Sequence, residues 1–554
     1  MPECVTISKY KKKRKERSEF MGDKQGKYWS EPEIQKERIL DKMTGRVKNS
    51  LSGFLRVCMV AFFVFLQFGL IIALPFWLNR YTVYFYVFVE IASLIVILTL
   101  INDVRSPAYK IAWISICTIF PISGEIMFLL WGKAGSSKKI DEKLTNIMSH
   151  GEEYKEYDPE CKKQLHESVP STVRMSNYLE AEGFPLTKNN QVRYFSMGED
   201  AFESIIADLI QAKHFILMDF FIVAEGALWD AIHEVCLRKI KEGVEVKFIF
   251  DDFGAMLRTD KYFARDLREE GFEVAVFNPI HRYTDKLYMN YRSHQKIMVI
   301  DGNIGYTGGF NLADEYANLV QRFGVWKDTG IRVEGDAVWW LTVTFLQMWE
   351  ISTEKVGIDF NKYRPTEKFP ETDVYCQVIA DGPLNNPNNP IEMVYGQMIH
   401  YACEYLYVMT PYLIIEKDMQ DALINAVKSG VDVRIITPFI PDKKTVKLIT
   451  NYNYGYLLKN GVRIFEYLPG FIHAKCILNE SCGIVGSINM DYRSFYLHYE
   501  NGVWIANKQV VSDIKKDFDD TFKECKEITY EEWCQRPLRM KAEQAVLNLF
   551  STLF

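Results

Sequence analysis

The sequence has little net charge and lacks closely spaced cysteine pairs. Its 554 residues carry a formal net charge of -6, which argues against a protein that wraps nucleic acid through overall basicity. The 11 cysteines are scattered and form no C-x-x-C pair, so neither a zinc site nor a disulfide framework is indicated. Buried, reduced thiols are the favoured interpretation, which places the catalytic part in a reducing compartment.

The composition is that of a folded chain with some membrane contact. Hydrophobic residues make up 48% of the sequence and aromatic residues 14%, which excludes a disordered chain. The length exceeds what one ordinary core needs, so we expect two or more domains. Residues 1–56 are mostly polar and basic, and because they precede the first long apolar run no cleavable signal peptide is expected.

Three long apolar segments follow this tail. Residues 57–78 carry no formal charge, and the second segment, Thr82–Ile101, begins after a short turn. The third segment, residues 111–131, contains Pro121 and Gly124. Three runs of this length so close together favour membrane helices over buried core helices.

The basic residues that flank these segments predict the topology. Residues 1–56 and the residues after the third segment are both basic, and the positive-inside rule places both on the cytoplasmic side. Three full crossings would separate them. We therefore expect a membrane-anchor region over residues 57–131 with two or three apolar helices, the third segment being re-entrant or interfacial. The protein is then a multi-pass protein of the cell membrane with a cytoplasmic catalytic part. The tail either touches anionic lipid or is solvated.

The rest of the chain has an α/β pattern and contains an internal duplication. Three strand-like runs and a His-x-Lys motif occur twice in the same order, and a glycine ends the helices in both copies. We predict two similar lobes, residues 136–365 and 366–554, packed about a pseudo-twofold axis. The matching strands are expected at 212–219, 243–250 and 272–277 in the first copy and at 402–409, 430–437 and 462–467 in the second.

The two His-x-Lys motifs, His294/Lys296 and His473/Lys475, are the strongest chemical signal. Alternation along a strand puts residues i and i+2 on one face, so each lobe presents an imidazole beside an ammonium. Together they predict a phosphate site with a nucleophile and a proton donor that requires no metal. One such motif is uninformative, but two at the same place in a repeat are hard to obtain by chance.

Polar residues that follow each motif are candidates for binding the phosphate or orienting the histidines. Asn311 and Asn489 each close a turn of small residues and can donate hydrogen bonds to phosphate oxygens. Asp328 and Glu500 lie further on, and each can hold a catalytic imidazole by its second nitrogen. The alternative, that Asp328 and Glu500 are ordinary structural carboxylates, is equally weighted.

The motifs resemble those of the phospholipase D superfamily. His294, Lys296 and Asp301, followed by Gly308-Gly-Phe-Asn311, match its HKD motif. The second copy is similar at His473, Lys475, Gly486, Ser487 and Asn489 but has Glu480 where the motif has aspartate. In the superfamily that carboxylate is mainly structural, so Glu480 puts the local structure in doubt more than the chemistry.

The chain as a whole resembles bacterial cardiolipin synthases over about residues 50–530. The segments that carry this resemblance are Asp251-Asp-Phe-Gly254, Tyr291-Arg-Ser-His294, Asn311-Leu-Ala-Asp-Glu-Tyr316, Trp326-Lys-Asp-Thr329, Asp381-Gly-Pro383, Thr410-Pro-Tyr412 and Asn489-Met-Asp-Tyr-Arg-Ser-Phe495. The resemblance implies transfer of a phosphatidyl group between two phosphatidylglycerol molecules, without a cofactor, through a phosphatidyl-histidine. His294 is then the nucleophile and His473 the proton donor and acceptor, although the symmetry of the sequence also allows the reverse.

Alternatives remain open from sequence. A membrane phospholipase D, or a transferase with another alcohol acceptor, would use the same motifs. A nuclease is disfavoured by the charge and the apolar segments. A non-catalytic membrane scaffold would not need the histidines and lysines. The apolar C-terminus, residues 545–554, is either a further lipid contact or, as the favoured interpretation, a packed terminal helix. The oligomeric state and the regulation are not indicated.

Overall fold

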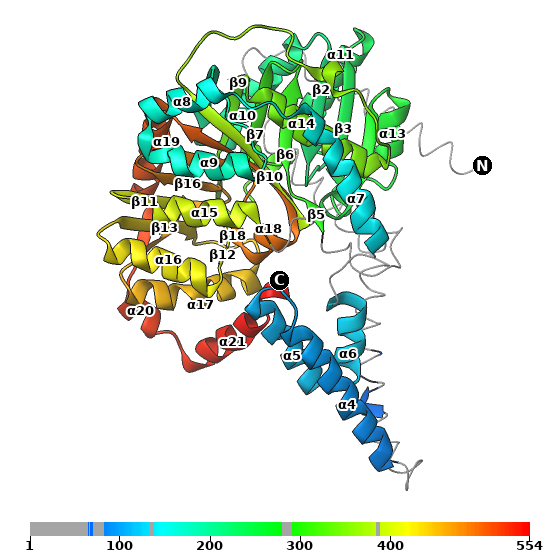
Figure 1. Cartoon of the computed structure of the whole chain (residues 1–554), viewed down its shortest axis with the longest axis vertical. Coiled ribbons are helices and arrows are strands. Elements are labelled where there is room, and N and C mark those ends of the chain that lie inside the picture. The colour runs from blue at the N-terminus through cyan, green and yellow to red at the C-terminus, as the bar shows by residue number, and fades with distance from the viewer. Residues whose placement is uncertain are drawn as a thin grey trace, which may run out of the picture.

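The computed structural model describes residues 62, 65, 67–69, 82–132, 138–279, 291–383 and 388–553. Two α/β lobes pack against each other, and a group of N-terminal helices projects from one end (Figure 1). The predicted basic tail, residues 1–56, and most of the first apolar segment, residues 57–78, lie outside the described residues.

The first lobe is built on a seven-stranded sheet with the order β1-β9-β7-β6-β2-β3-β4. The β2, β3 and β4 strands run parallel, whereas the β6, β7 and β9 strands pair antiparallel. The strands are β1 (Asn190–Phe195), β2 (Phe215–Phe220), β3 (Glu245–Asp251), β4 (Glu273–Phe277), β6 (Lys296–Ile300), β7 (Ile304–Gly308) and β9 (Gly330–Gly335).

The second lobe repeats this order as β10-β19-β17-β16-β11-β13-β14, with β20 added at the edge. The predicted duplication is thus confirmed strand by strand. Glycines after the helices have positive φ in both copies, 92° at Gly243 and 97° at Gly430. The strands are β10 (Tyr375–Asp381), β11 (Tyr405–Met409), β13 (Asp432–Pro438), β14 (Arg463–Tyr467), β16 (Cys476–Asn479), β17 (Gly483–Gly486), β19 (His498–Ala506) and β20 (Cys525–Ile528).

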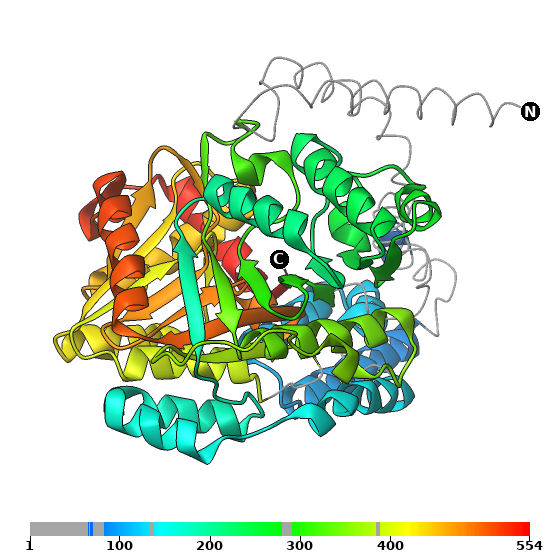
Figure 2. The ribbon, with the colours of Figure 1, turned by 90° about the horizontal axis from the view of Figure 1, so that it is seen from above.

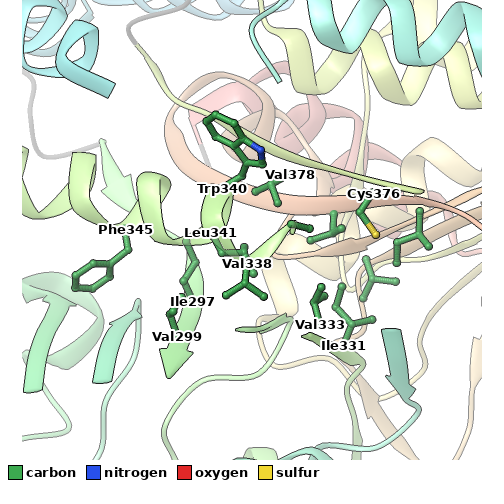
Figure 3. Close-up of a cluster of buried hydrophobic side chains, with 14 of the residues drawn as sticks. Ile297, Val299, Ile331, Val333, Val338, Trp340, Leu341, Phe345, Cys376 and Val378 are labelled. Carbon is green, nitrogen blue, oxygen red and sulfur yellow. The ribbon is translucent and has the colours of Figure 1, made fainter. Parts of the chain in front are cut away.

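Helices cover both sheets (Figure 2). One apolar core contains residues of both lobes. In β6, Ile297 and Val299 enter the shared core, whereas Met298 and Ile300 enter the outer core of the first lobe, as strand alternation requires. Figure 3 shows side chains of both lobes meeting around α14. The covering helices are α10 (Gly198–Gln211), α11 (Ala227–Lys241), α12 (Asp252–Ala255), α13 (Phe263–Glu269), α14 (Val338–Thr353), α15 (Pro390–His400), α16 (Lys417–Lys428), α17 (Lys444–Lys459) and α19 (Lys508–Lys523).

Two short strands cross from one lobe to the other. The β5 strand (Arg292–Ser293) of the first lobe pairs with β19 of the second, and β15 (Gly470–Ile472) of the second lobe pairs with β8 (Val325–Lys327) of the first. Each crossing strand ends one residue before the histidine of a His-x-Lys motif. This exchange brings the two motifs to the interface between the lobes.

The segment before the first sheet does not belong to the first lobe alone. Helix α7 (Lys138–His150) contacts α14, but α8 (Pro159–Ser168) and α9 (Val173–Ala181) contribute Leu165 and Leu179 to the core of the second lobe. The predicted lobe boundary at residue 136 did not anticipate this crossover, because the helices pack on a sheet that begins nearly 200 residues later in the chain.

The N-terminal helices are α4 (Thr82–Ile101), α5 (Pro107–Ile119) and α6 (Ser123–Met127), followed by the short π-helix η3 (Phe128–Gly132). Among the described residues, α4 alone is long and apolar enough to span a membrane, over Val83–Ile101. The third predicted segment is interrupted between α5 and α6, where Pro121 removes a helical hydrogen bond. A re-entrant or interfacial course for it stays a prediction.

Helix α5 attaches these helices to the second lobe. Tyr109 stacks on Tyr492 of α18 (Tyr492–Tyr496), with the ring centroids 6.4 Å apart, and the Ser106 hydroxyl donates to Glu416. The chain ends with α20 (Tyr530–Cys534), α21 (Leu538–Leu549) and the 3-10 helix η10 (Ser551–Leu553), which contacts both α5 and α18.

Candidate active site

The first half-site centres on His294, at the end of β5. Its backbone N–H donates to the carbonyl of Tyr499, 2.8 Å away, which continues the β5–β19 pairing. This register aligns His294 with Glu500, and Nδ1 lies 2.9 Å from both carboxylate oxygens. Because Nδ1 faces Glu500, Nε2 is left for the site. The orienting carboxylate therefore comes from the other lobe.

The second half-site repeats the arrangement with the lobes exchanged. The N–H of His473 donates to the Lys327 carbonyl at 2.7 Å, and Nδ1 lies 2.6 Å from Asp328 Oδ2. Both Asp328 and Glu500 are fully buried. A Cβ atom at Gly309 would lie 2.0 Å from Asp328 Oδ1, so only glycine permits the close approach. The predicted orienting role of the two carboxylates fits this geometry.

The two lysines lie beside their histidines and are buried. Lys296 is fully buried, and its ammonium donates to the carbonyl oxygen of His294. Lys475 is equally enclosed, and its Nζ lies 2.8 Å from Nδ1 of His473. Burial lowers the pKa of Lys296 to about 7 and that of Lys475 to about 8, because water no longer stabilises the ammonium.

The histidines share one electrostatic environment. Burial lowers the pKa of His294 well below its usual value, and the charges of Lys296, His498, Lys475 and His473 add to this effect. The pKa of His473 falls to about 4 through burial and Lys475, although Asp328 opposes the shift. Lys475 and His473 act on His294 across the lobe interface, as a site shared by the two motifs requires. These lowered pKa values favour the neutral form of both imidazoles near pH 7.

The two asparagines have amide atoms available to a ligand. Asn311 is held by the Ile222 N–H, which donates to Oδ1 at 2.9 Å, and its Nδ2 is buried without a hydrogen-bond partner. In Asn489 the side-chain oxygen is the unpartnered atom, and exchanging the amide oxygen and nitrogen would present a donor instead. Unpaired buried amides are costly. A phosphate oxygen would satisfy them.

Asp301 and Glu480 are not brought to the histidines. Asp301 lies at the far end of β6 from Lys296, about 16 Å along the strand, and its carboxylate accepts from the N–H groups of Lys213, His214 and Phe215 at 2.7–2.9 Å. Glu480 accepts in the same way from the N–H groups at 403 and 404. Both carboxylates support the start of a strand, and this geometry gives them no contact with a substrate.

A layer of buried polar groups fixes the β5 strand ahead of His294. The Ser293 N–H donates to Asp251 at 3.2 Å, and its hydroxyl donates to Asp219. The guanidinium of Arg292 lies 3.3 Å from Asp251, with both residues buried. The role of Asp251 explains why the Asp-Asp-Phe-Gly segment accompanies the motifs. Asp219 was not singled out in the sequence.

His498 is a second imidazole beside His294 that the sequence analysis missed as a site residue. The ring centroids lie 5.4 Å apart, and His498 Nδ1 is 3.5 Å from Glu500. The signal was available, because His498 and Glu500 are two residues apart in one strand and so share a face. In the described part of the chain, His294, His498 and Glu500 are the one group whose ligand atoms suit a metal, all within 4.8 Å of one another. Metal independence stays a prediction.

Comparisons with known proteins agree with the geometry. The family model described as "Cardiolipin synthase, PLD-like domain" matches residues 205–349 and again 395–522, once for each motif. A second model, "Phospholipase_D-nuclease N-terminal", matches residues 91–133. A cardiolipin synthase of Geobacillus kaustophilus is 31% identical over 88% of this chain and 97% of its own length.

The chain belongs to the cardiolipin synthase family of the phospholipase D superfamily. An uncharacterized protein of Streptococcus mutans is 36% identical over 82% of this chain and 99% of its own length. Among solved structures, the phosphatidylserine synthase of Haemophilus influenzae superposes with a TM-score of 0.54 at 14% identity, over 68% of this chain and 99% of that one. At that identity the superposition shows the fold alone.

Proposed function

We propose that this protein is a cardiolipin synthase that transfers a phosphatidyl group from one phosphatidylglycerol to another, releasing glycerol. The observation that carries the proposal is the pair of crossed half-sites. Each presents a neutral imidazole, oriented by a carboxylate of the other lobe, beside a buried lysine. That set of groups suits a phosphodiester. The family of the chain directs it to phospholipid substrates.

In the first step, His294 Nε2 attacks the phosphorus of one phosphatidylglycerol. A bond forms between nitrogen and phosphorus, the bond from phosphorus to the glycerol oxygen breaks, and His473 gives the leaving oxygen its proton. Substrate must bind with His473 protonated, which the phosphate charge favours. Lys296 and Lys475 then stabilise the equatorial oxygens, and Asn311 and Asn489 supply the hydrogen bonds.

In the second step, His473 takes a proton from a hydroxyl of the second phosphatidylglycerol. That oxygen attacks phosphorus, the nitrogen–phosphorus bond breaks, and His294 is restored. The assignment of roles is supported by the carboxylates. Glu500 accepts from the hydroxyls of Ser487 and Ser494 as well as from His294, which weakens its hold on the proton of His294 and favours the neutral nucleophile. Asp328 accepts instead from His473 and from the N–H of Thr329.

Transfer instead of hydrolysis requires an acceptor lipid in place of water. Helix α4 would anchor the enzyme in the bilayer, where both lipids are concentrated. We place the protein in the cell membrane, with the lobes on the cytoplasmic side because basic residues flank the apolar segments.

The test is lipid analysis after incubating the purified protein in detergent with phosphatidylglycerol alone. Cardiolipin and free glycerol are expected, and neither should form with His294→Ala or His473→Ala. Phosphatidic acid without cardiolipin would make the enzyme a hydrolase. Loss of activity in a chelator would contradict a metal-free mechanism.

A further inference from the structure

Helix α21 occupies an unusual position for a C-terminal helix. It lies across the end of the second lobe from which the N-terminal helices project (Figure 1). It packs on α17 and also contacts α5, and the following η10 contacts α5 and α18. The serine of α18, Ser494, holds Glu500. Helix α21 and η10 therefore lie between the N-terminal helices and α18, whose Ser494 supports Glu500.

Helix α21 exposes a large part of its apolar surface. Its one buried residue is polar, Gln544, which accepts a hydrogen bond from Arg536. Several apolar residues point outward, with Leu538 exposed by 82% and Val546 by 60%, whereas Leu547 is partly buried. Helical spacing places the exposed residues in one stripe. The stripe consists of Leu538, Ala542, Ala545, Val546 and Leu549.

Charge and position both indicate what covers this stripe. At 100° per residue, Arg539 and Lys541 flank the stripe on its two sides. An apolar face with basic residues at its edges is typical of helices that lie in the interface of an anionic bilayer. The neighbouring α5 follows directly on α4, the candidate span over Val83–Ile101.

We propose that α21 is an interfacial membrane helix. Its stripe enters the upper acyl region of the bilayer, and Arg539 and Lys541 contact anionic headgroups. The second lobe is then held to the membrane at both α5 and α21. This proposal rests on α4 lying in the membrane, but it holds for any phosphatidyl transfer at the site.

The experiment places the photo-crosslinking residue p-benzoylphenylalanine at Val546 of the full-length protein. The protein is reconstituted in phosphatidylglycerol vesicles whose acyl chains carry an alkyne tag. The matched control places the same residue at Val356, a valine of similar exposure, 51%, between α14 and the 3-10 helix η8 (Phe360–Tyr363) of the first lobe. Leu538 provides a second site at the other end of the stripe. Retained consumption of phosphatidylglycerol, whatever the product, verifies that each variant is folded.

Irradiation should give a tagged lipid adduct at Val546 and Leu538, and at most a small fraction of that yield at Val356. Equal lipid labelling at all three positions would overturn the proposal, as would the absence of lipid adducts at Val546 and Leu538. A cross-linked species of twice the chain mass, in place of lipid adducts, would show that a second copy of the chain covers the stripe. Because the test reads lipid contact and not turnover, it is independent of which product the enzyme makes.

Discussion

The two half-sites have the same plan but are supported differently. Glu500 shares its oxygens among His294 and two serine hydroxyls and has His498 beside it. Asp328 accepts from His473 and from the N–H of Thr329 at 2.9 Å, and aromatic rings of Tyr316 and Trp326 surround that imidazole. Duplication thus supplied two equal imidazoles, and their different surroundings support the proposed roles of His294 as nucleophile and His473 as proton carrier.

The largest expected effect comes from removing either imidazole. His294→Ala and His473→Ala should each lower kcat by about 10⁴-fold or more, as losses of a nucleophile or its acid–base partner do. Cardiolipin formation from phosphatidylglycerol measures the rate. The double variant should be no worse than either single variant, because both histidines serve one reaction. Additive losses would mean two independent sites.

Replacing the two orienting carboxylates should lower kcat to different extents. Asp328→Asn should cost about 10²- to 10⁴-fold in kcat, because an amide has one oxygen and cannot accept from both His473 and Thr329. Glu500→Gln should cost less, since Ser487 and Ser494 can rotate their hydroxyls to accept from the new amide. Steady-state rates of the two variants decide the order. The opposite order would contradict the different support described for the two half-sites.

Replacing the two buried lysines should stabilise the protein to different extents. Lys296→Met removes an ammonium whose pKa falls from 10.5 to about 7 on folding. Burying this ammonium lowers the stability of the wild-type protein by about 1.4 kcal/mol for each unit of pKa shift. The loss of stability is complete below pH 7 and disappears as the pH rises to 10.5. The variant should therefore be inactive but more stable, most clearly at or below pH 7. Lys475→Met should gain less, because its pKa falls only to about 8. Thermal unfolding against pH measures both.

His498 should affect one half-site only. In its protonated form His498 helps to lower the pKa of His294, although burial also lowers the pKa of His498 itself; His498→Asn should therefore raise the pKa of His294. Activity requires neutral His294, and it is lost as pH falls through this pKa. The acid limb of kcat/KM should therefore move to higher pH in the variant, with a modest change in the maximum. An unchanged limb would mean that His498 is only structural.

The smallest effect on turnover is expected at Asp301. Asp301→Asn weakens contacts to three backbone N–H groups and should lower stability by about 1–3 kcal/mol. Because the residue lies far from the histidines, the pH profile of kcat/KM should not move. Glu480→Asp, which restores the usual residue of the motif, serves as its control in the other lobe.

Local patterns predicted much of this molecule. Strand alternation placed His294 with Lys296 and His473 with Lys475, and repeated strands predicted two similar lobes. The exchange of β5 and β15 between the lobes was not predictable, because pairings between residues 206 and 145 positions apart leave no local signal. That exchange decides which carboxylate serves which histidine. For the same reason, the packing of α8 and α9 on the second lobe could not be predicted from the sequence.

The most direct test of the unequal half-sites is to trap the intermediate. A phosphatidyl donor with a p-nitrophenol leaving group needs no acid, so His473→Asn should still form the covalent adduct and then stall without a base. After acid-free quenching, mass spectrometry of peptides should find the phosphatidyl group on His294 in this variant and none in His294→Asn. A phosphatidyl group on His473 in His294→Asn, with none on His294 in the other variant, would contradict the assignment.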